Sequence, residues 1–166
     1  MVDSKAHLYG VTAVHLLVVD DNSPDGTGGL ADELAKKDQR IFVLHRQQKN
    51  GLGKAYVAGF AWALDRDYDA ICEMDADFSH NPSYLPEFWR LLKDFDVVLG
   101  SRYVLGGGVK NWGLGRRAIS RGGSIYAQAI LGMPVNDMTG GFNAWRRKVL
   151  EGVDISSLRS EGYAFQ

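Results

Sequence analysis

Short apolar runs alternate with segments of helical spacing along most of this chain, and this alternation limits the possible folds more than any other feature. The apolar runs lie at residues 14–20, 41–45, 69–74 and 96–101, and the helical segments at 27–38, 53–66, 82–94 and 116–131. Strands separated by helices of about 10 to 15 residues are typical of βαβ units, in which a mostly parallel sheet carries helices on both faces. We therefore predict an α/β fold in a single domain over residues 1–166.

Composition excludes several classes of protein. The 166 residues include 19 basic and 20 acidic side chains, a net charge of −1, so no overall charge attracts the chain to nucleic acid or anionic lipid. No apolar run approaches the roughly 20 residues that span a membrane, and the N-terminus lacks the apolar segment of a secretory signal. We expect a cytoplasmic protein with no nucleic-acid partner.

Polar clusters follow three of the predicted strands, in the stretches "VVDDNSPDGT", "EMDADFSH" and "VVLGSRY". In open α/β sheets, ligands bind outside the carboxyl ends of the strands. Convergence of these ends would place Asp20 and Asp21, the pair Asp75 and Asp77, and Arg102 around one crevice.

The acid pair Asp75 and Asp77 follows the third apolar run. In an extended segment, residues i and i+2 point the same way, so the two carboxylates repel each other unless a cation lies between them. Hard oxygen ligands suit Mg²⁺ or Mn²⁺. A D-x-D sequence alone also fits a solvated turn, but its position opposite an arginine and a second acid pair favours a metal site. His80 could add a ligand, although a role in capping the next helix is favoured.

The loop after the first strand, residues 20–27, allows more than one interpretation. Its acids partly match the spacing of a calcium-binding EF-hand loop, but Pro24 and the preceding strand disfavour that reading. Ser23 or Asp25 is expected to cap the helix that starts at Thr27. The acids at the strand end could accept hydrogen bonds from a base or ribose.

"NGLGKAYVAG" resembles a phosphate-binding loop but lacks the glycine and Ser/Thr spacing of one. Lys54 either reaches a phosphate or is solvated.

Basic residues cluster where an anionic substrate would lie. Arg102 follows the fourth strand, and Arg116 and Arg117 open the next helix, whose N-terminus also attracts phosphate. The stretch 135–145, with Asp137 and Thr139 before two glycines, is predicted to be a binding loop. The alternatives are a solvated helix face for the arginines and a simple turn for the loop.

Seven blocks together resemble the polyprenol (dolichol) phosphate mannose synthases of the family 2 glycosyltransferases. They are, in order, "VVDDNSPDGT", "NGLGKAYVAGF", "MDADFSHNP", "GSRY", "RRAISRG", "DMTGGFNAWRR" and "EGYAFQ". The resemblance implies a GT-A (Rossmann-like) fold, a GDP-mannose donor, Mg²⁺ or Mn²⁺, and a polyprenyl phosphate acceptor. It also implies a peripheral location at the cytosolic face of a membrane, with a possible membrane-anchoring partner.

The same resemblance implies roles for individual residues. Asp75 and Asp77 would correspond to the D-x-D site for the metal and the nucleotide sugar, and Ser79 stands where some members carry a metal-binding Gln. Asp21 would match an acid that contacts the base. Two further positions, Arg102 and Arg117, would match arginines that hold donor and acceptor phosphates.

Two departures from the family pattern lead to further expectations. Family members begin with a strand that ends in a motif like P-T-Y-N-E, whereas only residues 1–13 precede Val14, and their later acidic and basic positions would lie beyond Gln166. On this basis we expect a partial catalytic domain that lacks the first strand and transfers mannose poorly on its own. Two alternatives are a family 2 transferase that uses another nucleotide sugar and a noncatalytic remnant that binds a nucleotide or metal.

Overall fold

The computed structural model describes residues 13–103, 114–132, 135, 137 and 140–157. The described residues fall into two compact units: residues 13–69 with 150–157 form unit 1, and those between 70 and 149 form unit 2. The expectation of a single domain stays a prediction.

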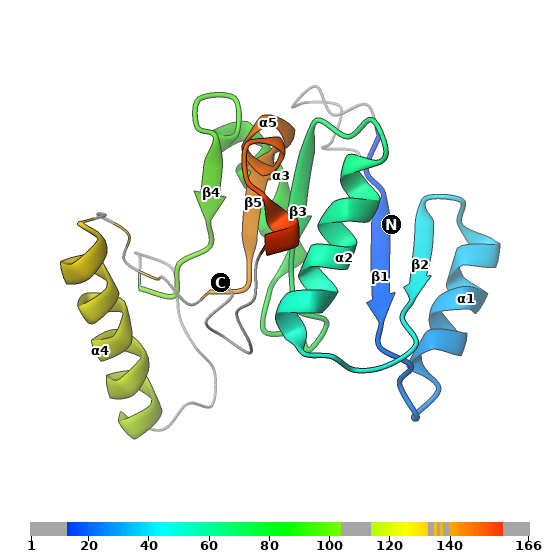
Figure 1. The fold of residues 1–166 in the computed structure, drawn as a ribbon, viewed down its shortest axis with the longest axis horizontal. Coiled ribbons are helices and arrows are strands. Elements are labelled where there is room, and N and C mark those ends of the chain that lie inside the picture. Colours follow the sequence, from blue (N-terminus) through cyan, green and yellow to red (C-terminus); the bar gives the residue numbers. More distant parts are fainter. Residues whose placement is uncertain (1–12, 104–113, 133–134, 136, 138–139, 158–166) are drawn as a thin grey trace. The chain divides into compact units, whose positions relative to one another are not determined.

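Unit 1 is built on two parallel strands, β1 (Leu16–Asp20) and β2 (Ile41–His45). Asp20 lies opposite His45 in the register, so both strands end at the same edge (Figure 1). Two helices follow the strands, α1 (Thr27–Lys37) and α2 (Leu52–Leu64), and a short 3₁₀ helix, η3 (Ile155–Ser157), completes the unit. The first two predicted βα repeats are confirmed.

The buried residues of the two helices in unit 1 are mostly small. Ala31 of α1 is buried, while Leu30 and Leu34 on the same helix are 70% and 52% exposed. In α2, Phe60 and Ala63 are buried. The N-cap position of α1 is Gly26, so neither Ser23 nor Asp25 occupies it as predicted. Asp25 precedes this position, and its Oδ1 accepts hydrogen bonds from the Thr27 N–H at 3.0 Å and the Thr27 hydroxyl at 2.7 Å.

Unit 2 contains a three-stranded sheet in the order β3-β5-β4, formed by β3 (Ala70–Glu73), β4 (Val97–Leu99) and β5 (Asn143–Arg146). The central strand β5 is antiparallel to both neighbours, so β3 and β4 run parallel to each other. The last part of the stretch 135–145 is therefore a strand, and the prediction that all of it is a loop is wrong. β5 has only four residues, of which two are apolar, so the sequence shows no apolar run there.

The core of unit 2 forms where helix α3 (Leu85–Leu91) packs against this sheet. It consists of five buried side chains: Phe88, Leu92, Val98, Phe142 and Ala144. The predicted helix at 82–94 starts as a 3₁₀ turn, η2 (Pro82–Tyr84), and its α-helical part ends at Leu91. Asn81 caps the turn, because its Oδ1 accepts a hydrogen bond from the Ser83 N–H at 3.0 Å.

The remaining helices are α4 (Leu114–Leu131) and α5 (Arg147–Glu151). Within the described residues, no helix has the length and apolar character needed to cross a membrane. The α/β class predicted from the alternation is confirmed, with β5 as its antiparallel strand.

Candidate active site

Asp20 ends β1 as a buried carboxylate that is only 5% exposed. Its two oxygens accept the Ser23 N–H at 3.3 and 3.4 Å, and hydrogen bonding from Ser23 lowers the pKa of Asp20 below its usual range. A side chain at position 28 would place its Cβ 2.5 Å from Asp20 Oδ2, so α1 approaches this closely only because Gly28 has none. Asp20 therefore organises the loop that carries Asp21.

Asp21 forms an ion pair with Arg46, with 2.5 Å between Asp21 Oδ1 and Arg46 Nη1. The two side chains are 19% and 14% exposed, respectively, so solvent screens this pair less than an ordinary surface pair. Sequence reasoning missed Arg46. Its position directly after β2 could have indicated it. Parallel strands in register bring the residues that follow Asp20 and His45 together.

His45 lies between two acids at the same edge of unit 1. Its Nε2 is 2.9 Å from Asp32 Oδ1, and its Nδ1 is 3.6 Å from Asp20 Oδ2. The hydrogen bond with Asp32 is the main reason why the pKa of His45 is raised, and Asp20 adds to it. Lys54, the third predicted substrate-binding residue of this unit, is exposed in the first turn of α2.

The acid pair follows β3 in unit 2. Asp77 Oδ1 accepts the Ser79 N–H at 2.9 Å and the Ser79 hydroxyl at 2.5 Å, and these bonds lower the pKa of Asp77. Asp77 is exposed and Asp75 is half-buried. The loop thus presents an ionised carboxylate whose orientation Ser79 fixes.

His80 closes the acid loop. Its Nδ1 accepts the Asp75 N–H at 2.9 Å, and its ring stacks on Phe142 with 5.1 Å between centroids. This hydrogen bond occupies one ring nitrogen, which disfavours the alternative of His80 as a metal ligand through Nδ1. Asn81 provides the helix cap, so the expectation that His80 caps the helix is wrong.

The donors in this loop suit a hard divalent cation in kind, because Asp75, Asp77 and Ser79 all present oxygen. Among the residues that the structure describes, no three His, Cys, Asp or Glu side chains gather into a ready-made metal site. Magnesium typically binds through one or two carboxylates and completes its shell with water and substrate phosphates. The residues present therefore fit an ion that is shared with a phosphorylated substrate.

Glu73, the last residue of β3, is buried behind the acid loop and 6% exposed. Its Oε1 accepts a hydrogen bond from Asn143 Nδ2 at 2.8 Å, whereas its Oε2 is buried without a hydrogen-bond partner among the described residues. Burial, with a further contribution from the charge of Asp75, raises the pKa of Glu73 to about 7, although the bond from Asn143 opposes the shift. Sequence reasoning assigned no role to either residue.

Arg102 is held by Asp137. Its Nε donates to Asp137 Oδ2 at 2.7 Å, and its Nη2 donates to Asp137 Oδ1 at 2.5 Å. The backbone N–H of Arg102 also donates to Oδ2, at 2.9 Å. The Asp137 side chain is 0% exposed and that of Arg102 is 22% exposed. The carboxylate raises the pKa of Arg102. Asp137, predicted to contact substrate, thus directs both its oxygens to Arg102 and holds it in place.

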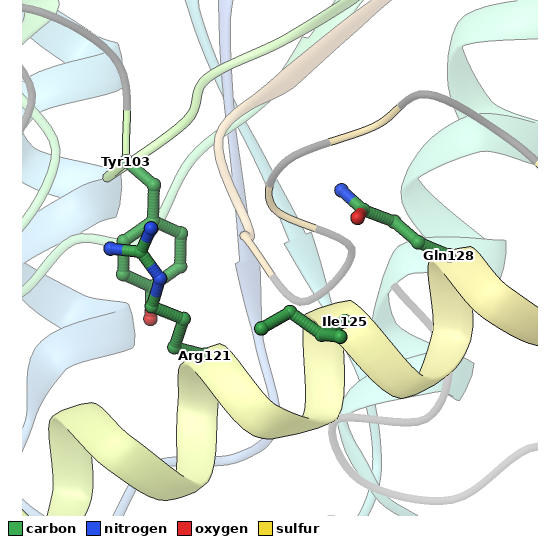
Figure 2. Close-up of a pocket in the computed structure, with 4 residues that line it drawn as sticks. All are labelled: Tyr103, Arg121, Ile125 and Gln128. Carbon is green, nitrogen blue, oxygen red and sulfur yellow. The ribbon is translucent and has the colours of Figure 1, made fainter.

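A small pocket lies between Tyr103 and one side of α4. Its volume is about 170 Å³, and it is lined by Tyr103, Arg121, Ile125 and Gln128 (Figure 2). Figure 2 shows the Arg121 guanidinium over the Tyr103 ring, at a Cζ-to-centroid distance of 5.7 Å. The Tyr103 hydroxyl donates to Ser120 Oγ at 2.8 Å. The lining thus combines a cation, an aromatic ring and an aliphatic side chain.

The structure brings some of the predicted site residues together. Arg102 contacts Asp137 and Asp77 contacts Ser79 within unit 2, while Asp20 ends β1 of unit 1 and Asp21 directly follows it. Arg116 and Arg117 belong to α4, but their side chains, like the whole of Thr139, lie outside the described residues. The single crevice around the acids and Arg102 stays a prediction.

Comparison with known proteins identifies a family, and the relatives that it finds include the two described below. The profile of "Glycosyl transferase family 2" matches residues 7–153. The chain is 48% identical over 151 residues to a protein of Micrococcus luteus named undecaprenyl-phosphate mannosyltransferase, covering 91% of this chain and 62% of that protein. It is 51% identical over 158 residues to a polyprenol monophosphomannose synthase of Mycolicibacterium smegmatis, covering 92% of this chain and 58% of the relative. The chain therefore spans about three fifths of the length of these relatives.

Proposed function

Because the chain belongs to glycosyltransferase family 2, we propose that it transfers mannose from GDP-mannose to a polyprenyl phosphate, with inversion at the anomeric carbon. The observation that carries the proposal is the end of β3, where Asp77 is kept ionised and oriented by Ser79. The names of the two relatives, each matched over more than nine tenths of this chain, support mannose and a lipid phosphate as the substrates.

Enzymes of this family generally use a divalent metal ion, and we assign Mg²⁺ or Mn²⁺ to Asp75, Asp77 and Ser79. Such an ion would supply neutralisation of the negative charge on the departing diphosphate. Asp77 provides a carboxylate of fixed direction, and His80 fixes the backbone at Asp75. These contacts prepare the loop for the donor before it binds.

The acceptor needs positioning more than activation. A phosphate monoester has a second pKa near 6, so it is largely dianionic and nucleophilic at pH 7. Arginines that align this dianion with the sugar therefore replace a general base. We assign this role to Arg102, held by Asp137, and to Arg117, with Arg116 and Thr139 as further contacts on the substrate.

The nucleotide is assigned to unit 1. Asp21, fixed by Arg46, would accept hydrogen bonds from the base, and Asp20 would support the loop around it. Lys54, exposed at the start of α2, would meet a phosphate. The lipid acceptor would place the protein at the cytosolic face of a membrane, with a membrane-anchoring partner.

A transfer assay tests the proposal. The protein is incubated with radiolabelled GDP-mannose, polyprenyl phosphate and Mn²⁺, and lipid-linked label is measured against an Asp77→Asn variant. We expect label above that control, even if turnover is slow. Label from UDP-glucose and not from GDP-mannose would indicate a different donor. Absence of transfer from either donor would indicate a noncatalytic protein.

A further inference from the structure

We propose that Asn143 is a positioning residue that holds the acid loop and the Arg102–Asp137 pair in one fixed arrangement. Asn143 is 4% exposed on the central strand β5. Its side-chain amide donates to Glu73 Oε1 at 2.8 Å and to the Gly140 carbonyl at 2.7 Å. A side-chain amide has two N–H donors, so one residue uses its full donor capacity to join two segments far apart in sequence.

The first contact reaches the acid loop. Glu73 ends β3 two residues before Asp75, and its position sets where the chain leaves the sheet. Within the part of the chain that the structure describes, Glu73 Oε2 has no hydrogen-bond partner, so the bond from Asn143 is the side-chain hydrogen bond that orients this buried carboxyl. Loss of the Asn143 amide would leave Glu73 buried without a donor, a costly state that favours movement of the strand end.

The second contact reaches the segment that holds the arginine. A Cβ added to Gly140 would lie 2.9 Å from the Gly100 carbonyl oxygen and 3.7 Å from Asp137 Cγ, so Gly140 packs directly against both. The Gly100 N–H donates to the carbonyl of Phe142, the residue before β5, at 2.7 Å. Asp137 in turn holds Arg102 through two hydrogen bonds to its guanidinium. Asn143 therefore connects the acid loop, which we assign to the metal and the donor, with the Arg102–Asp137 pair, which we assign to the acceptor phosphate.

The proposal rests on the proposed function only for its consequence in catalysis. Positioning would matter because a small displacement between the groups that hold the two substrates lowers the rate strongly. The positioning itself can be measured without substrate, because one backbone amide in each segment reports on its order. The Asp75 N–H donates to His80, and the Arg102 N–H donates to Asp137.

The test compares three variants. Glu73→Gln removes the charge but keeps an acceptor for Asn143. The double variant Glu73→Met with Asn143→Leu replaces both partners with apolar side chains of similar size, an exchange that can be nearly neutral for stability. Glu87→Gln is the control, since it weakens an exposed pair with Arg90 on α3 of the same unit. Urea unfolding, hydrogen exchange at the Asp75 and Arg102 amides, and kcat and KM are measured for each.

We expect the double variant to unfold near the wild-type urea midpoint while exchange at both amides accelerates at least tenfold. Its kcat should fall at least tenfold, whereas Glu73→Gln and Glu87→Gln should stay within about threefold of wild type. Unchanged exchange at either amide in the folded double variant would overturn the proposal and leave Asn143 as a satisfied core residue.

If the double variant does not fold, Asn143→Ser replaces it, because one hydroxyl donor cannot serve Glu73 and Gly140 together. Accelerated exchange at both amides is again expected, and wild-type rates would overturn the proposal. A wild-type protein that lacks transferase activity would refute the proposed function, while the exchange rates would still decide the role of Asn143.

Discussion

Asp137 and Arg102 form a bidentate pair in which the Asp137 side chain is completely buried and the Arg102 side chain is 22% exposed. Bidentate arginine–carboxylate geometry fixes the plane of the guanidinium as well as its place. An arginine that receives a phosphate benefits from this, because its orientation is set before the ligand arrives. Under the proposed function, Asp137 would therefore act on the substrate through Arg102.

Replacement of Asp137 by Asn should destabilise unit 2 and impair transfer. The change leaves the Arg102 charge without its anionic partner, and breaking a largely buried pair costs about 3 kcal/mol. We expect a loss of this order in urea unfolding and a fall of about 100-fold in kcat/KM. Asp96→Asn is the matched control, because Asp96 pairs with Lys148 at the surface and both are more than half exposed. A surface pair contributes about 0 to 1 kcal/mol, so equal losses in the two variants would contradict the account.

Arg46→Gln should weaken binding of the nucleotide sugar. Without the ion pair, Asp21 loses the contact that fixes its carboxylate, and we expect an affinity for GDP-mannose about tenfold lower, or about 1.4 kcal/mol. Calorimetry measures this directly. Arg40→Gln removes another arginine–aspartate pair, between Arg40 and Asp38, at the opposite end of β2, and should leave the affinity within twofold. Wild-type affinity in Arg46→Gln would rule out the role assigned to the pair.

Two adjacent glycines in α1 offer a steric test. Gly28→Ala would place a Cβ 2.5 Å from Asp20 Oδ2, whereas a Cβ at Gly29 would meet none of the described residues within 4 Å. Overpacking typically costs about 1–3 kcal/mol, and Gly→Ala at an open helical position gains up to about 1 kcal/mol. Thermal unfolding should therefore show Gly28→Ala below wild type and Gly29→Ala at or above it. The reverse order would mean that Asp20 does not pack against α1.

His45 should make the stability of unit 1 depend on pH. Its pKa is raised above the ordinary value of 6.5 by Asp32 and Asp20, the two acids that face it from α1 and β1. A raised pKa means that the stabilising contribution is complete below about pH 6.5 and is lost as the pH rises through the folded-state value. His45→Asn should lower Tm more at pH 6 than at pH 9. An equal effect at both pH values would show that the charge on His45 contributes nothing.

The alternation of apolar and helical segments predicted most of the elements because each βα repeat is written locally in the sequence. The strand at 41–45 is confirmed at both ends, and the helix predicted at 27–38 differs by one residue. Strand β5 could not be found in this way, because its four residues gain their partners only when β3 and β4 lie on either side.

The predicted site shows the same division. Asp77 with Ser79 is a local contact over two residues, and the sequence pointed to both. The pairing of Arg102 with Asp137 spans 35 residues and that of Glu73 with Asn143 spans 70, so no local pattern contains them. The sequence singled out Asp137 and Arg102 separately, as substrate contacts, but the pairing between them could not be predicted from it.

Binding of GDP-mannose with and without Mn²⁺, compared between wild type and Asp77→Asn by calorimetry, tests the central claim most directly. The account predicts that wild-type binding requires the metal and exceeds binding of UDP-glucose. Loss of the Asp77 carboxylate should weaken the metal-dependent affinity by about 100-fold, or about 2.7 kcal/mol. Metal-dependent binding of wild-type strength in Asp77→Asn would contradict the account.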